Sequence, residues 1–260
     1  MTTVPDAIVS RLRAAGCVFA EDEARLLAAA DPDRVEALVA RRVAGEPLEH
    51  LLGWAEFLGR RVVLEAGVFV PRRRTEFLAR RASALAAPGA VVLDLCCGSG
   101  AIGSAVAAAV AGVQVHAVDI QPAAVRCAER NLPGGHAYLG DLYEPLPGEL
   151  RGRVDLLVVN APYIPTGTIG LLPPEARLHE PRVALDGGAD GLDVQRRVIA
   201  GAPGWLAPGG TLLIETSERQ SPTTRALMQD AGLVAEVLRY EPLDATVVVG
   251  RPGATGRSGA

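Results

Sequence analysis

Four consecutive residues, Asn160-Ala161-Pro162-Tyr163, follow the apolar run 154–159 and suit the binding of a planar amide. An amide nitrogen is a poor nucleophile, because its lone pair is delocalised into the carbonyl. Two hydrogen-bond acceptors aimed at its N–H groups position it and stabilise charge that develops on nitrogen. The Asn160 side-chain oxygen and the Ala161 carbonyl are such acceptors, while Pro162 rigidifies the turn and Tyr163 offers an aromatic wall. These four residues are the predicted catalytic turn.

A second candidate site is the glycine-rich stretch from Asp94 to Gly103, which begins within the end of another apolar run. Glycines such as Gly98 and Gly100 tolerate a positive φ and let the backbone approach a ligand closely. Asp119 stands 19 residues after Gly100, at the end of the next apolar run, where a carboxylate can accept both hydroxyls of a ribose. The two features together predict a crevice that binds a nucleoside.

The stretch 98–103 also satisfies the dinucleotide fingerprint G-x-G-x-x-G, so a nicotinamide enzyme is an alternative. Two acids favour S-adenosyl-L-methionine instead: Asp94 opens the motif within its strand, and Asp141 follows a later strand, where it can receive the adenine amino group. The expected cofactor is therefore S-adenosyl-L-methionine. The residues predicted to bind it are Asp94, Cys96, Gly98, Gly100, Asp119, Ile120, Asp141, Leu142 and Asn160.

Short apolar runs alternating with helical segments must position these residues. The predicted strands are 91–95, 114–118, 137–139, 154–159 and 211–215, each a short and mainly apolar run, as expected for strands buried on both faces. Two β-rich runs, 233–239 and 245–249, are expected to close the sheet edge as an antiparallel pair. The predicted fold is α/β, with a doubly wound parallel sheet.

The region before the predicted sheet has a helical spacing of apolar residues. Up to residue 52 apolar residues recur at intervals of three and four, and Asp31-Pro32 resembles an N-cap followed by a helix start. From 55 to 70 the period shifts toward two around two glycines, which predicts a hairpin. The predicted domains are a helical domain at 1–54, a β-hairpin linker at 55–73, an α/β domain at 74–252 and a disordered tail at 253–260.

Composition limits the function. The chain has 260 residues, a formal net charge of -4 and a pI of about 5.7, so it lacks the broad basic surface that phosphate binding needs, and nucleic acid is a poor candidate partner. The run Arg72–Arg74 is either a solvated helix start or an anion-contacting patch. Neither cysteines nor histidines show metal-ligand spacing, so no metal site is expected. No signal peptide or membrane span is apparent, and a cytoplasmic protein is expected.

The motifs together resemble the HemK/PrmC family of protein-(glutamine) methyltransferases over about residues 41–251. The segments that carry the resemblance are Gly45-Glu46-Pro47-Leu48, Phe69-Val70-Pro71-Arg72 with Thr75-Glu76, the glycine turn, Asn160-Ala161-Pro162-Tyr163, Glu180-Pro181, Asp190-Gly191-Leu192 and Glu215 with Gln220. The resemblance implies that the sheet is a Rossmann-like class I methyltransferase sheet, that residues 1–54 form a substrate-recognition domain and that residues 74–252 form the S-adenosyl-L-methionine-dependent methyltransferase domain. It implies methylation of the glutamine in the Gly-Gly-Gln tip of class I peptide-chain release factors. It also implies that Asp119 holds the ribose and that Asn160 with Ala161 binds the glutamine amide.

Three features depart from the family pattern. Ala161 replaces the first proline of Asn-Pro-Pro-Tyr, Arg73-Arg74 replaces a proline and an acid in the linker motif, and no glycine follows Glu215. The N-terminal domain is also shorter than in the release-factor enzyme. These differences concern the acceptor more than the cofactor. The alternatives are therefore N-methylation of a small molecule or nucleobase amine, a nicotinamide-dependent oxidoreductase, and a non-catalytic binding module.

Overall fold

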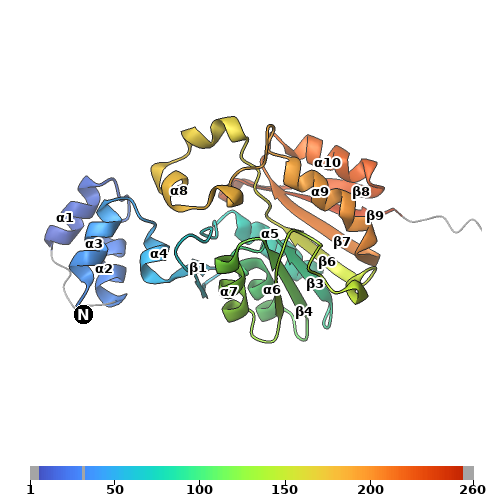
Figure 1. Cartoon of the computed structure of the whole chain (residues 1–260), viewed down its shortest axis with the longest axis horizontal. Helices are drawn as coiled ribbons and strands as arrows, with labels where there is room; N and C mark the ends of the chain where they lie inside the picture. The colour runs from blue at the N-terminus through green and yellow to red at the C-terminus, as the bar shows by residue number, and fades with distance from the viewer. Residues whose placement is uncertain (1–5, 31–32, 254–260) are drawn as a thin grey trace, which may run out of the picture.

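The structure is a computed structural model that describes residues 6–30 and 33–253. A small group of helices lies at one end of the molecule and a larger α/β unit at the other, with a two-stranded hairpin between them (Figure 1). The predicted cap at 31–32 and all but the first residue of the predicted tail, 253–260, lie outside the described residues.

The N-terminal helices form a small hydrophobic core of their own. They are α1 (Asp6–Ala14), α2 (Ala20–Ala30), α3 (Val35–Val43) and the short α4 (Leu48–Leu52). The apolar spacing seen in the sequence places Leu12, Leu27 and Val39 in the interior of this cluster, separate from the two clusters of the sheet. The helical period of this region is therefore confirmed.

The hairpin consists of β1 (Trp54–Phe57) and β2 (Arg60–Val63), which pair antiparallel. Leu58 and Gly59 connect them, both with positive φ, as a tight two-residue hairpin turn requires. Residues 68–70, which end the stretch with a period near two, form no strand. Their buried side chains enter the main core, but no neighbouring strand pairs with them, and the Val70 N–H donates to the Glu180 carboxylate instead.

The large sheet has seven strands in the order β5-β4-β3-β6-β7-β9-β8. The strands are β3 (Val91–Leu95), β4 (Gln114–Asp119), β5 (His136–Leu139), β6 (Val154–Val159), β7 (Leu206–Thr216), β8 (Leu233–Tyr240) and β9 (Ala245–Pro252). The first five pair parallel, and β9 runs antiparallel to both β7 and β8. The predicted parallel sheet and its antiparallel closing pair are confirmed. The order reverses between β3 and β6, so a crevice is expected at their carboxyl ends.

Helices cover both faces of the sheet (Figure 1). One face carries α5 (Thr75–Leu85), α6 (Ala101–Ala109) and α7 (Pro122–Asn131), and the other carries α9 (Asp193–Gly201) and α10 (Ser221–Asp230). Every residue of β3 is buried, which explains why four of its five residues are apolar, the exception being Asp94. None of the helices within residues 6–30 and 33–253 combines the length and the hydropathy that a membrane span requires.

The segment that follows β6 does not pack on the sheet. It contains α8 (Pro174–His179) and the short 3-10 helices Thr166–Leu171 and Arg182–Ala184, and it extends over the carboxyl ends of the strands toward the N-terminal helices (Figure 1). Further 3-10 turns lie at Gly148–Leu150, Ala202–Gly204 and Glu241–Leu243. We call residues 164–185 the cover segment.

Candidate active site

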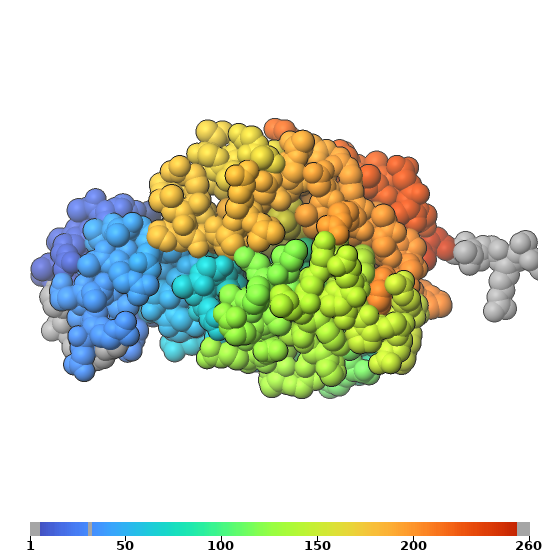
Figure 2. All heavy atoms as spheres, viewed as in Figure 1, coloured from blue at the N-terminus to red at the C-terminus, as the bar shows by residue number. Residues whose placement is uncertain are grey.

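A cavity of about 500 Å³ opens at the carboxyl ends of β3, β4 and β6, beneath the cover segment. Figure 2 shows the surface hollowed along the line where the yellow and orange cover segment meets the green helices. The cavity brings together ten of the predicted residues: Cys96, Gly98, Asp119, Ile120, Asp141, Leu142, Asn160, Ala161, Pro162 and Tyr163. The carboxyl ends of adjacent strands thus join the glycine turn and the Asn160 turn in one site.

Asp119 is held in a fixed orientation at one side of this cavity. Its Oδ2 accepts a hydrogen bond from the Gly98 N–H and its Oδ1 accepts one from the Gln121 N–H, both at 2.9 Å. Burial raises the pKa of the carboxyl, and these backbone donors oppose that rise. Each carboxylate oxygen keeps a further lone pair for a ligand, so Asp119 can accept two hydroxyl groups.

The backbone of the glycine turn leaves room for a ligand at Gly98. This residue has a φ of +53° and lines the cavity, and a Cβ placed on it meets no atom within 4 Å. A side chain at this position would therefore project into the space that a ligand needs. Cys96 adopts a φ of 56° in the same turn, a conformation that is costly for a residue with a side chain.

Two predicted cofactor-binding residues do not line the cavity. Asp94 is 0% exposed, and its Oδ2 accepts the Gly103 N–H at 2.9 Å. Burial raises the pKa of Asp94 to about 8. The residue thus supports the start of α6 from beneath the turn. Gly100 is the N-cap of α6 and faces Ala128 of α7 instead of the cavity. Both motif residues shape the turn from behind.

Replacing Gly100 with alanine should destabilise the fold without entering the cavity. Its φ is +74°, and an added Cβ would lie 3.1 Å from the Cα and Cβ of Ala128. The left-handed backbone and the crowding together cost about 2–4 kcal/mol. Urea unfolding measures this cost. Gly148→Ala is the matched control, because its Cβ meets no atom within 4 Å; a Gly100→Ala midpoint equal to that of the control would refute the prediction.

Asp141, two residues after the end of β5, lines the cavity and has a partner that the sequence did not reveal. Its Oδ2 accepts a hydrogen bond from the Arg197 guanidinium of α9 at 2.8 Å, and both residues line the cavity. The partners are 56 residues apart along the chain. No local spacing connects them, so only the packing of α9 on the sheet identifies Arg197 as a site residue.

The Asn160 turn is anchored on both sides. The Asn160 Nδ2 donates to the Thr75 Oγ1 at 3.3 Å, and the Tyr163 carbonyl accepts from the Gln220 Nε2 at 3.0 Å. Burial, followed by the nearby Glu215 carboxylate, raises the pKa of Tyr163 to about 12, so its hydroxyl stays neutral at physiological pH. Ala161 is buried at the wall of the cavity. The turn therefore presents a neutral, fixed surface to a ligand.

Two arginines of the run Arg72–Arg74 belong to the site. Arg72 donates from Nη2 to both oxygens of Glu180, at 2.7 and 2.6 Å, and its guanidinium carbon lies 4.9 Å from the centre of the Phe69 ring. The Arg74 Nε lies 3.8 Å from the Glu215 Oε1. Both arginines line the cavity. Of the two interpretations of this run, a solvated helix start does not describe Arg72, which ties the linker to the cover segment.

The strand order with its antiparallel closing pair, and the cavity at the switch point, define a Rossmann-like methyltransferase fold. A ribosomal protein L11 methylase from Lactobacillus delbrueckii subsp. bulgaricus superposes with a TM-score of 0.54 at 17% identity, covering 74% of this chain and 86% of that one. At 17% identity this similarity shows a shared fold and nothing about the acceptor.

Sequence comparison is more specific. The model of the Methyltransferase small domain matches residues 60–169. A release factor glutamine methyltransferase of Geobacter sulfurreducens is 40% identical over 217 residues, which cover 82% of this chain and 75% of that relative. A 4-amino-L-phenylalanine/4-methylamino-L-phenylalanine methyltransferase of Streptomyces pristinaespiralis is 39% identical over 215 residues, covering 79% and 73%.

The chain therefore belongs to the HemK/PrmC family of methyltransferases. The nicotinamide-dependent oxidoreductase considered from the glycine motif is excluded by this membership. S-adenosyl-L-methionine is the cofactor, and the residues fit it. Gly98 leaves open space at the turn, and the half-buried Asp119 has lone pairs free for ribose hydroxyls. The cavity volume also lies in the range of small-molecule sites.

Proposed function

We propose that this protein methylates the side-chain amide nitrogen of a glutamine in a protein, with a class I release factor as the acceptor. The observation that carries the proposal is the Asn160 turn, which stands in the same cavity as Asp119 and is anchored at Thr75 and Gln220. It is supported by relatives that bear the name release factor glutamine methyltransferase.

We assign the roles of the site residues as follows. Gly98 and Asp119 hold the ribose side of S-adenosyl-L-methionine, with Asp141 toward the adenine and Cys96, Ile120 and Leu142 alongside. When bound, the cofactor supplies an electrophilic methyl group on a sulfonium. The Asn160 oxygen and the Ala161 carbonyl accept the two N–H groups of the acceptor amide and orient its nitrogen. The nitrogen would bond to the methyl carbon as the sulfur–methyl bond breaks, with S-adenosyl-L-homocysteine as the leaving group, and it would release one proton to water.

The elements around the cavity support a polypeptide acceptor. The cover segment exposes apolar side chains at its surface, among them Leu171, 84% exposed, and Leu178. It also joins the N-terminal helices through Arg42, which pairs with Glu23 and with Glu175 of α8. We propose residues 1–54 as the substrate-recognition domain, 55–73 as the linker and 74–252 as the catalytic domain.

A second candidate is N-methylation of an amine on a free amino acid. The Streptomyces pristinaespiralis relative, whose name specifies an aminophenylalanine acceptor, is nearly as similar to this chain as the named release factor enzymes are. Arg74 also departs from the family pattern at the cavity wall, where a guanidinium can attract a carboxylate.

A direct comparison of acceptors tests the proposal. Purified enzyme and labelled S-adenosyl-L-methionine are incubated with an unmethylated class I release factor, with the same factor carrying alanine in place of the Gly-Gly-Gln glutamine, with 4-amino-L-phenylalanine and with duplex DNA. We expect label only in the intact factor, located on the glutamine by mass spectrometry. Label only in the free amino acid would transfer the assignment to the second candidate, and label in DNA would refute both.

A further inference from the structure

A buried acid stands behind the Asn160 turn. Glu215, near the end of β7, and Thr75, the first residue of α5, are each 2% exposed. Thr75 accepts a hydrogen bond from the Asn160 Nδ2 at 3.3 Å, and its hydroxyl is near enough to the Glu215 carboxyl group to lower the pKa of that group. Among the described residues, the buried Glu215 Oε2 has no hydrogen-bond partner. The three side chains therefore follow one another from the buried Glu215 to the cavity wall, where Thr75 and Asn160 lie.

The direction of hydrogen bonding among these side chains follows from their chemistry. An ionised carboxylate only accepts hydrogen bonds and the Asn160 Nδ2 already donates to Thr75, so of these two neighbours only Glu215 can accept the single hydroxyl proton of Thr75. The Thr75 oxygen can then only accept, and it takes the N–H that Asn160 supplies. Because the amide is planar, its oxygen points away from Thr75, where it is free to accept from a ligand.

We propose that Glu215 and Thr75 are positioning residues that set which end of the Asn160 amide faces the acceptor. This inference rests on the proposed function, in which Asn160 accepts from the substrate N–H. A neutral Glu215 can instead donate to Thr75, which frees the Thr75 proton to point at Asn160. The amide would then turn its NH₂ group toward the acceptor, where it repels the substrate N–H.

Charged and titratable groups around Glu215 bear on when it is ionised. The Arg74 guanidinium, from the residue before α5, lies 3.8 Å from Oε1 and favours the ionised form. Burial acts in the opposite direction and raises the pKa of Glu215 to about 7. From the turn after β6, the Tyr163 hydroxyl stays neutral, and on β9 the residue paired with Glu215 is the apolar Val247. Ionised Glu215 is the competent form, so turnover should fall as pH decreases through about 7.

Thr75 variants test the kinetic consequence. Thr75→Val keeps the shape but removes the hydroxyl, and kcat should fall about 10- to 100-fold because the Asn160 amide loses its fixed orientation. Thr75→Ser keeps the hydroxyl and should restore kcat to within about threefold of wild type. Calorimetric affinity for S-adenosylhomocysteine should stay within about twofold in both variants, which separates this effect from misfolding. Wild-type kcat in Thr75→Val would overturn the proposal.

A readout without any acceptor separates this inference from the proposed function. In ¹⁵N-labelled free enzyme, the Asn160 side-chain NH₂ resonances, assigned by their loss in Asn160→Ala, should shift with a midpoint near pH 7. They should not shift in Glu215→Gln, which has no titrating proton. The inference is wrong if the chemical shifts of the wild-type resonances do not change with pH. It is also wrong if the shifts change equally in Glu215→Gln. If they titrate as expected while release factor is not methylated, only the proposed acceptor fails.

Discussion

Asn160→Ala should reduce methyl transfer by about 100- to 1,000-fold while leaving cofactor affinity within about twofold of wild type. The side-chain oxygen of Asn160 is one of two acceptors proposed for the substrate N–H groups, and loss of one preorganised polar contact in a dry site has an effect of this size. Single-turnover transfer to unmethylated release factor measures the loss. Calorimetry with S-adenosylhomocysteine measures the affinity.

The control for this variant is Gln114→Ala, which removes an exposed amide at the start of β4, at the opposite end of that strand from the cavity. It should methylate at the wild-type rate. If Asn160→Ala is equally active, the amide-binding role of the turn is wrong. If Asn160→Ala instead loses cofactor affinity in proportion to its activity, the residue belongs to the cofactor half of the site.

Asp119→Ala should weaken binding of S-adenosyl-L-methionine by about 30- to 300-fold. The variant removes both acceptors for the ribose hydroxyls and leaves the Gly98 and Gln121 N–H groups without their partner. Hydrogen bonds to a charged group contribute about 1.5–3 kcal/mol each, and part of that is recovered when water enters. Calorimetric titration measures the affinity, and turnover at saturating cofactor should fall less than affinity does.

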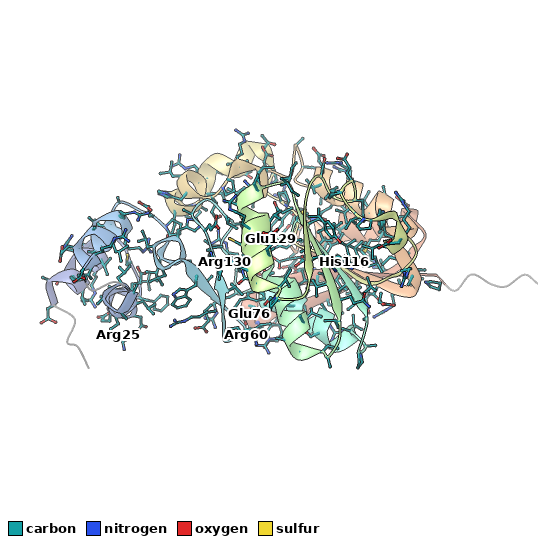
Figure 3. The ribbon with its side chains drawn as sticks, turned by 60° about the horizontal axis from the view of Figure 1, so that its bottom comes forward. Arg25, Arg60, Glu76, His116, Glu129 and Arg130 are labelled. Carbon is teal, nitrogen blue, oxygen red and sulfur yellow. The ribbon has the colours of Figure 1, made fainter. Side chains whose placement is uncertain are left out.

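A second variant at this position, Asp119→Asn, tests whether the ribose contact needs both carboxylate oxygens. Each carboxylate oxygen accepts a backbone N–H, so an amide at this position must turn its NH₂ group toward one of the two donors. The affinity of Asp119→Asn should therefore be almost as low as that of Asp119→Ala. Glu129→Ala, which removes an exposed acid on α7 (Figure 3), should bind like wild type. Wild-type affinity in Asp119→Asn would contradict the proposed ribose contact.

Much of the fold could be predicted because its signals are local. Strands buried on both faces are short apolar runs, and β3 and β6 have the predicted bounds. Parallel strands place their carboxyl ends at one edge, so residues that follow these runs meet in one place. Asp119 and Asn160 could therefore be placed in one cavity from their positions after strands. Glu215 could also have been recognised from the sequence, because an acid near the end of an apolar run is buried and needs a hydrogen-bond or charged partner in the interior.

The tertiary structure alone decided the partners of these residues. Asp94 and Gly100 belong to the glycine motif, yet one lies beneath the turn and the other against α7, because a motif does not specify which side of the backbone faces the ligand. The contacts of Thr75 with Asn160 and of Arg197 with Asp141 join residues 85 and 56 positions apart. Such pairs leave no periodic trace in the sequence, because they depend on how helices dock on the sheet and not on the conformation of either segment.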